Sequence, residues 1–197
     1  MSATAQHGEE RLTPGARRIL DVASKLFYER GIHAVGVDTI ATESGVTKRT
    51  LYDRFGSKDR LLVMYLEGRD RRWRAKITDR LDAEADDPVR RVLVPFDVLL
   101  DWLPENPRGC SFVNAFAELP EPDHPAHQVI VDEKKWLRAL FRTLLEEAGA
   151  TETETLSLQL LSLHEGAIVS YATTDEPTAP TSARSAARAL IQQRLDT

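Results

Sequence analysis

The sequence has a single cysteine, Cys110, and no long apolar run. One cysteine cannot form a disulfide within the chain, which is typical of a protein in a reducing compartment. No stretch approaches the run of about eighteen apolar residues that a transmembrane helix needs, and the polar segment 1–10 lacks the apolar core of a signal peptide. We therefore expect a soluble, cytoplasmic protein with no membrane partner.

The sequence also lacks the short motifs that carry much enzyme chemistry. It has no glycine-rich phosphate loop and no serine nucleophile elbow. Cys110 lies in no signature of a catalytic thiol, and the adjacent His164 and Glu165 are expected on different faces of a helix, a poor geometry for an acid/base pair. We expect no catalytic residues and no cofactor, and enzyme activity is disfavoured.

Metal-ligating side chains come together in the sequence at Asp123, His124 and His127. They could cluster if a helix begins at Pro125, but no second set of ligands follows at zinc-like spacing. A solvated loop explains the three residues, so we predict no metal, and a bound ion there stays open as the alternative.

The charge is distributed unevenly along the chain. The net charge of −5 argues at first against nucleic acid as a partner, but residues 1–76 carry 15 Lys and Arg against 10 Asp and Glu, whereas residues 77–197 carry 11 against 21. Because affinity for DNA depends on local contacts to phosphates, an acidic distal region is compatible with DNA binding.

Apolar residues recur at helical spacing along almost the whole chain, which predicts an all-α fold. Thr13 and Pro14 supply a cap and a first-turn proline, and they open a helix that is expected to end before Gly31. The helices are predicted over 14–30, over 37–44, from near Thr47, from Ser57 toward Asp82, from Pro88 to Leu103, and over 109–119, 125–148, 152–173 and 181–195.

The most informative segment is 45–58, where Gly45 supplies a turn between two short helices. In the second of them, Leu51 and Phe55 lie four residues apart and can turn inward together, which leaves polar side chains facing outward. Arg and Lys bind phosphates or guanine edges, Thr offers a hydroxyl to a base edge, and Tyr donates to phosphate. Ser57 is expected to cap the next helix and to place Lys58 near the duplex backbone. We predict DNA contacts from Thr47, Lys48, Arg49, Thr50, Tyr52, Arg54 and Lys58; the alternative is an ordinary solvated hairpin of helices with a charged face.

The segment 14–66 resembles the DNA-binding domain of the TetR/AcrR family of one-component transcriptional regulators. The resemblance is carried by Gly45-Val46, Thr50-Leu51-Tyr52, Phe55 and the run 57–62, and it covers about a quarter of the chain. It implies an all-helical homodimer with an N-terminal three-helix DNA-binding domain, a larger C-terminal ligand-binding and dimerisation domain, and repression that a small molecule relieves.

The same resemblance implies roles for individual residues. Lys48, Arg49 and Thr50 match positions that reach base edges, Tyr52 matches a phosphate-binding tyrosine, and Lys58 matches a lysine that contacts the DNA backbone. Arg54 stands where the family often has histidine, so its longer, permanently charged side chain is expected to add a phosphate contact. Gly36 stands where a serine or threonine often caps the second helix, a departure that weakens the cap without threatening the helix.

We expect three regions along the chain: a disordered N-terminal arm over 1–12, the helix-turn-helix domain over 13–60, and a ligand-binding and dimerisation domain over 61–197, joined by the helix that starts at Ser57. The helix over 152–173 is apolar on two sides, so one side can face its own domain and the other a second copy. Small residues on the last helix would allow another helix to approach closely. A two-fold four-helix interface built by the last two helices is the predicted homodimer, with a larger monomeric core as the alternative.

The C-terminal helices also offer aromatic walls with a few polar groups, which is typical of a ligand pocket. The candidate ligand-binding residues are Phe96, Leu100, Phe112, Phe116, Trp136 and His164. We predict a homodimeric repressor that a small-molecule ligand releases from a palindromic operator in double-stranded DNA. The alternatives are a DNA-binding protein that acts in chromosome organisation without an inducer, and a helical small-molecule-binding protein.

Overall fold

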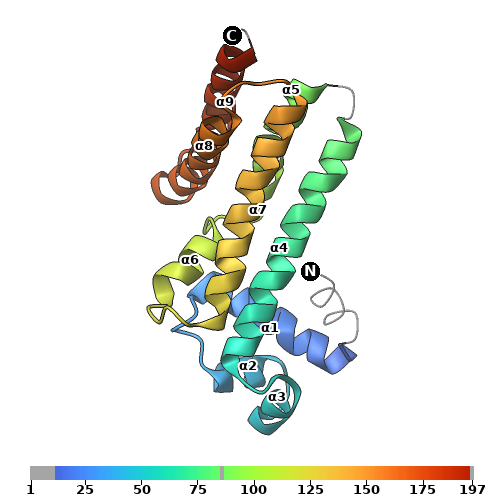
Figure 1. The fold of residues 1–197 in the computed structure, drawn as a ribbon. Helices are drawn as coiled ribbons and strands as arrows, with labels where there is room; N and C mark the ends of the chain where they lie inside the picture. Colours follow the sequence, from blue (N-terminus) through green and yellow to red (C-terminus); the bar gives the residue numbers. More distant parts are fainter. Residues whose placement is uncertain (1–11, 85–86, 196–197) are drawn as a thin grey trace. The chain divides into compact units, whose positions relative to one another are not determined.

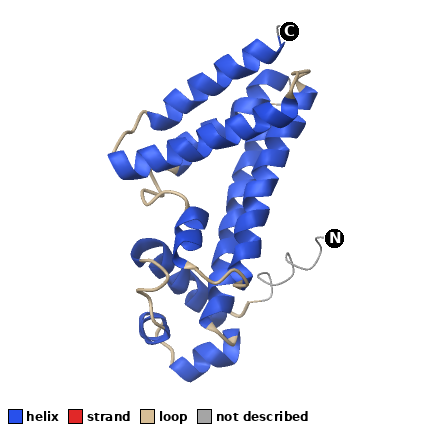
Figure 2. Cartoon of the chain, turned by 60° about the vertical axis from the view of Figure 1, so that its left-hand side comes forward, coloured by secondary structure: helices blue, strands red, loops and turns tan. Residues whose placement is uncertain are grey.

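The structure, a computed structural model, describes residues 12–84 and 87–195. Within these ranges all regular secondary structure is α-helical, as Figure 2 shows. The predicted all-α fold is therefore confirmed. The expected arm over 1–12 lies outside the described residues except for Leu12.

The helices lie close to the predicted ranges (Figure 1). They are α1 (Pro14–Arg30), α2 (Val37–Glu43), α3 (Lys48–Phe55), α4 (Lys58–Ala83), α5 (Pro88–Trp102), α6 (Ser111–Glu118), α7 (Pro125–Glu147), α8 (Thr153–Thr174) and α9 (Ala179–Leu195).

The chain divides into two compact units. The first, which we call the N-terminal unit, comprises residues 1–68 and 114–129, and the second, the C-terminal unit, comprises residues 69–113 and 130–197. Helices α4, α6 and α7 contribute residues to both. The N-terminal unit therefore includes the segment 114–129, which the expected boundary after residue 60 assigned to the other region. The functional boundaries at residues 12 and 60 stay predictions, because compactness and function are different properties.

In the N-terminal unit, α1 has the cap that its sequence predicts. Thr13 Oγ1 accepts a hydrogen bond from the Ala16 backbone N–H at 3.3 Å, and Pro14 occupies the first turn, where it leaves no helical hydrogen bond unmade. The helix ends at Gly31, whose φ of +88° is costly for a residue with a Cβ. The inward stripe of α1 is buried: Ala16, Ile19, Leu20, Ala23, Leu26 and Phe27.

In the C-terminal unit, α8 and α9 run side by side (Figures 1 and 2). Helix α9 also packs against α5. Ala183 and Ala187 of α9 lie one turn apart and are buried in the core of this unit. The Arg184 guanidinium donates to both carboxylate oxygens of Asp97 on α5, at 2.5 and 3.2 Å. This bidentate pair fixes the rotation of α9 about its own axis.

The core of the C-terminal unit contains an aromatic cluster. Phe96 of α5 lies 5.7 Å from Phe141 of α7, measured between ring centroids, and the His164 ring of α8 lies 5.7 Å from Phe96 and 6.2 Å from Phe141. All three side chains are buried. No helix in the described ranges is long and apolar enough to cross a lipid bilayer.

Two leucines of the C-terminal unit test this description of its core. Leu137 has no exposed surface, whereas Leu100 is 39% exposed. We expect Leu137→Ala to lower the free energy of unfolding by about 2–5 kcal/mol, because it removes buried methyl groups and leaves a cavity. Leu100→Ala should change it by less than about 0.5 kcal/mol. Urea unfolding followed by circular dichroism at 222 nm measures both; similar losses for the two variants would contradict the described packing.

Candidate nucleic-acid interface and ligand cavity

The turn between α2 and α3 has the geometry of a helix-turn-helix. Gly45 has a φ of +66°, and its N–H donates to the Thr42 carbonyl oxygen at 3.1 Å. The Val46 N–H then donates to the Ala41 carbonyl oxygen at 3.0 Å, which closes the turn. Ser44 is buried beneath it, with its hydroxyl donating to the Ile40 carbonyl oxygen at 2.6 Å.

Helix α3 is held by a cap at its start and by two buried side chains. Thr47 Oγ1 accepts a hydrogen bond from the Thr50 backbone N–H at 3.1 Å and lies 2.9 Å from the Thr50 hydroxyl. Leu51 and Phe55 are buried, as the spacing predicts. Because eight residues are too few for a helix that is stable alone, these contacts determine its position.

The outward face of α3 carries the side chains that the sequence predicts for DNA contact. Lys48, Arg49, Tyr52 and Arg54 are exposed, and Thr50 is half-buried. The Arg49 side chain, 91% exposed, lies 3.9 Å from Asp53. Lys48 Nζ pairs with Asp38 of α2 at 3.1 Å, and Arg54 donates to Thr13 Oγ1 at 2.8 Å. Most of these polar groups are thus accessible, although Lys48, Arg49 and Arg54 each have a partner within the unit.

Lys58 has a different environment from the α3 side chains. Its Nζ donates to the Ile32 carbonyl oxygen at 2.6 Å and lies 5.9 Å from the centre of the Phe27 ring. Burial lowers the pKa of this lysine, while Asp59 and Glu118 act in the opposite direction. An ammonium group has three N–H donors and Ile32 takes one. Lys58 therefore fastens the turn after α1 and retains donors for a phosphate.

The Glu118 carboxylate also binds the turn after α1, from the C-terminal end of α6. Its Oε2 accepts from the His33 backbone N–H at 2.8 Å, and the His33 ring nitrogen Nδ1 lies 3.5 Å away. A Cβ at Gly31 would lie 3.1 Å from Glu118 Oε1, closer than an ordinary van der Waals contact, so a larger residue there would push the carboxylate away. Burial alone would raise the pKa of Glu118, but the N–H groups of His33 and Ile32 lower it. No signal in the sequence indicates this contact, because it joins residues 85 positions apart.

His124, in the loop before α7, and His127, in the first turn of α7, both have contacts within the protein. His124 Nδ1 accepts from the Ala126 N–H at 3.1 Å, and its Nε2 lies 3.5 Å from Asp59. His127 Nε2 lies 2.9 Å from the Leu119 carbonyl oxygen. Within residues 12–84 and 87–195, no three His, Cys, Asp or Glu side chains are arranged to hold a metal ion.

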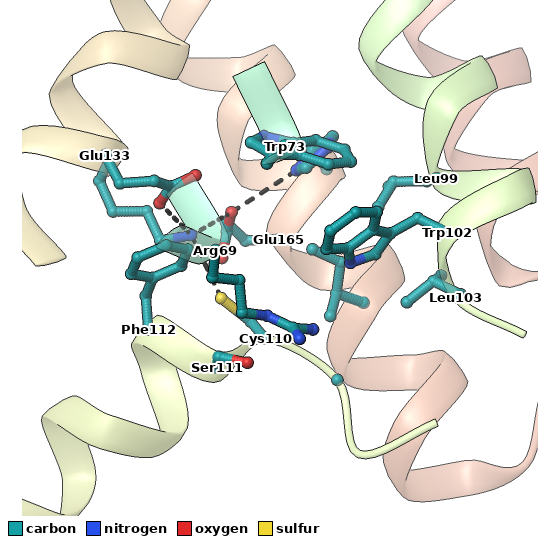
Figure 3. A pocket seen from close by; sticks show the side chains of 14 residues that line it. Arg69, Trp73, Leu99, Trp102, Leu103, Cys110, Ser111, Phe112, Glu133 and Glu165 are labelled. Carbon is teal, nitrogen blue, oxygen red and sulfur yellow. Dashed lines mark hydrogen bonds and ion pairs between the residues drawn. The ribbon is translucent and has the colours of Figure 1, made fainter. Parts of the chain in front are cut away.

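The C-terminal unit contains a cavity of about 30 Å³, enough for about two water molecules. In Figure 3 the Trp73 and Trp102 rings stand on one side, with Glu133 and Phe112 on the other. The lining residues come from α4, α5, α7 and α8, from the first turn of α6 and from the segment between α5 and α6: Arg69, Trp73, Leu99, Trp102, Leu103, Gly109, Cys110, Ser111, Phe112, Glu133, Lys134, His164, Glu165 and Ile168.

Lys134 is the centre of the polar part of this cavity. Its Nζ lies 2.8 Å from Glu165 Oε1, 3.0 Å from Glu133 Oε2 and 3.4 Å from the Cys110 sulfur. Burial alone would lower the pKa of Lys134, but the charges around it raise the pKa, so the ammonium stays protonated. Glu165 is its ionised partner: burial opposes ionisation, yet the adjacent His164 ring and the charge of Lys134 lower the pKa of Glu165 to about 2.

Burial dominates at the other titratable groups of the cavity. It raises the pKa of Glu133 and of the Cys110 thiol, and it lowers the pKa of His164, which is therefore a neutral imidazole. His164 Nδ1 lies 3.5 Å from Glu165 Oε1, so the expectation that these neighbours face apart on the helix was wrong. The long glutamate side chain reaches back across the helix face.

The structure brings two of the six candidate ligand-binding residues to this cavity, Phe112 and His164. The other four lie elsewhere. Phe96 is fully buried against His164, and Leu100 and Phe116 are 39% and 57% exposed. The Trp136 ring is covered by the Arg74 guanidinium, 4.5 Å from the ring centre. Sequence reasoning overlooked the charged lining, above all Glu133 and Lys134, because adjacent ionisable residues on a helix normally indicate a solvated face.

The capped α3 after a glycine turn, with Leu51 and Phe55 buried beneath it, has the geometry of a helix-turn-helix. The family model described as "Bacterial regulatory proteins, tetR family" matches residues 19–64. The chain is similar to the crystal structure of SCO4454, a TetR-family transcriptional regulator from Streptomyces coelicolor, with a TM-score of 0.86 and 29% identity over 92% of this chain and 96% of that one. Residues 19–64 thus match the TetR family model, and the chain resembles a TetR-family transcriptional regulator over most of its length.

Two curated relatives agree with this assignment. The HTH-type transcriptional regulator Rv1255c of Mycobacterium tuberculosis is 32% identical over 107 residues, which cover 54% of this chain and 52% of the relative. The chain thus matches about half the length of that protein. The HTH-type transcriptional activator FasR of Mycolicibacterium smegmatis is 27% identical over 156 residues, 73% of this chain and 70% of the relative.

The pH dependence of unfolding tests the role of Glu118. Because the folded state lowers its pKa, Glu118 stabilises the fold above the ordinary pKa of glutamate, and this contribution is lost as the pH falls through the lower folded value. Glu118→Gln should therefore be less stable than the wild type at pH 7, with a difference that shrinks toward acid pH. Thermal unfolding from pH 3 to 7 measures this. The exposed Glu121→Gln is the control, and a difference independent of pH would contradict the assigned role.

The pairing of Lys48 with Asp38 gives a second test. Asp38→Asn frees Lys48 and removes a negative charge beside the predicted DNA face, so we expect tighter binding to random-sequence duplex. The slope of log K against log salt should steepen by up to about 0.9, the value for one additional phosphate contact. Fluorescence anisotropy over a salt series gives the slope. Glu43→Gln, which breaks the Arg30 pair at the other end of α2, is the matched control; equal slopes for wild type and Asp38→Asn would refute the interpretation.

Proposed function

We propose that the protein is a homodimeric repressor that binds a palindromic operator through α3 and leaves it when a small-molecule ligand enters the cavity of the C-terminal unit. The observation that carries the DNA-binding part is the outward face of α3, where Lys48, Arg49 and Tyr52 project from a helix held by Leu51 and Phe55. Arg49 is the candidate for a guanine edge, and Tyr52 and Arg54 are candidates for phosphate. The protein then acts where the chromosome lies, in the cytoplasm.

Dimerisation is proposed through the outward faces of α8 and α9. On α8, Leu158 and Val169 are 48% and 49% exposed, and Gly166 lies between them with nothing within 4 Å of the position of a Cβ. On α9, Ser182, Ala186 and Ala189 are exposed on the side away from the buried Ala183 and Ala187. Apolar and small residues on two adjacent helices allow the same pair from a second copy to pack closely, which makes a four-helix interface.

Helix α6 is the proposed route from ligand to DNA. Ser111 and Phe112 in its first turn line the cavity, and Glu118 at its last turn binds the backbone of the turn after α1. A ligand that requires a wider cavity would favour a displaced α6 and a weaker hold on that turn. Only a ligand with different affinities for the two states shifts the equilibrium between them.

Two alternatives remain from the sequence, and one relative bears on the direction of control. FasR is named an activator. The opposite direction of control, in which a ligand recruits the protein to DNA, is therefore the alternative to release by a ligand. A DNA-binding protein without an inducer would bind an operator and respond to no ligand. A helical small-molecule-binding protein would bind a ligand and prefer no duplex.

Selection from a random duplex library, followed by footprinting, tests the proposed function. We expect a palindrome with half-sites one helical turn apart, about 34–36 Å between their centres, because a two-fold dimer presents two copies of α3. Arg49→Ala should relax the base preference at one position of each half-site at a cost of about 1–3 kcal/mol, whereas Tyr52→Phe should weaken binding to all sequences alike. An asymmetric footprint, or an Arg49→Ala variant with unchanged preference, would count against the proposal.

A further inference from the structure

Three buried residues of the cavity in the C-terminal unit carry polar atoms without a hydrogen-bond partner in the part of the chain that the structure describes. The atoms are Ser111 Oγ, Glu133 Oε2 and both ring nitrogens of His164, and each residue is at most 4% exposed. Glu133 Oε2 has Lys134 Nζ at 3.0 Å, but outside hydrogen-bond geometry. Buried polar atoms in folded proteins are nearly always hydrogen-bonded, so a group of them around one cavity indicates a bound polar molecule.

The formal charges that line the cavity cancel. Arg69 and Lys134 supply two positive charges, and Glu133 and Glu165 supply two negative ones. Lys134 lies directly between the two carboxylates, and Arg69 donates to the amide oxygen of Asn106 at 2.6 Å. A ligand with its own net charge would lose its hydration on entry and would find a set of charges already balanced, which makes its binding costly.

The three residues with unpartnered atoms offer both donors and acceptors. A neutral imidazole has one N–H donor and one acceptor nitrogen, a serine hydroxyl can do either, and a carboxyl oxygen accepts. The rest of the wall is apolar and planar: the Trp73 and Trp102 rings lie 5.4 Å apart in an edge-to-face arrangement, and Phe112 faces the cavity. Flat apolar walls with a few convergent polar groups suit a planar molecule that carries one polar group.

We propose that the cavity binds an uncharged planar molecule whose polar group both donates and accepts hydrogen bonds, such as a carboxamide, and that Ser111 and His164 are its principal hydrogen-bonding residues. The cavity of about 30 Å³ takes only the polar group, so entry of the planar body moves the aromatic wall apart. Phe112 belongs to that wall and to the first turn of α6, so binding displaces the helix that ends at Glu118. The inference rests on the proposed function in treating this cavity as the effector site.

Three probes of one shape and different charge test the inference: benzamide is neutral, benzoate is an anion and benzamidine is a cation at pH 7. Isothermal titration of the full chain should give a dissociation constant for benzamide at least about tenfold lower than for the other two. Tighter binding of benzoate or benzamidine overturns the inference, and so does the absence of any binding at millimolar concentrations. Benzoate binding that takes up a proton from the buffer would show that the site holds a carboxylic acid whose negative charge is neutralised by a proton shared with Glu133. This result would also overturn the inference.

Variants assign the hydrogen bonds to the two residues. Ser111→Ala and His164→Phe should each weaken benzamide binding at least about fivefold, because each loses a partner while the packing volume is nearly kept. Ser162→Ala is the control, since that hydroxyl is exposed and bonds the Leu158 carbonyl oxygen of its own helix. Unchanged benzamide affinity in Ser111→Ala overturns the assignment, even if His164→Phe fails to fold.

Operator binding is measured on the same preparations, so that the two proposals fail separately. A wild-type protein that binds its operator but no benzamide contradicts the ligand inference alone. A wild-type protein that binds benzamide but prefers no duplex contradicts the proposed function and leaves the chemistry of the cavity standing.

Discussion

The bond between the Glu118 carboxylate and the backbone of the turn after α1 is the contact on which the arrangement of the N-terminal unit depends. Backbone N–H groups in a turn have no helical acceptor, and this turn finds one in a side chain from a distant part of the sequence. Lys58 supplies the complementary contact to the Ile32 carbonyl oxygen. A carboxylate thus binds a backbone N–H of this turn and an ammonium group binds one of its carbonyl oxygens. Helices α2 and α3 come directly after the turn in the sequence.

The C-terminal unit differs in that it keeps ionisable groups inside an apolar core. Lys134 stays charged because Glu165 and Glu133 flank it, and Glu165 stays ionised for the reciprocal reason. His164 is neutral instead of charged, because it is buried among aromatic rings and burial lowers its pKa. Buried charge of this kind adds little to stability, so its presence beside a cavity is more easily understood as serving a ligand than as serving the fold.

Local rules predicted much of the fold and less of the site. The ends of α1 followed from Thr13, Pro14 and Gly31, and the start of α3 from Thr47, because caps and turns are determined by residues close in sequence. Leu100 and Phe116 were expected at a ligand and are exposed, since apolar character alone does not say which side of a helix meets the core. Glu118 and the inward charges of α7 escaped prediction because their meaning depends on partners far along the chain, which no periodicity encodes.

Cys110 gives the molecule a single site for labelling by a thiol reagent. It is the only thiol in the sequence, and it lies at the cavity 3.4 Å from an ammonium group. Burial keeps the thiol protonated, so alkylating reagents should react slowly with the closed form and faster with any form that admits water. One fluorophore attached there would follow the opening of the cavity in real time, with no background from a second site.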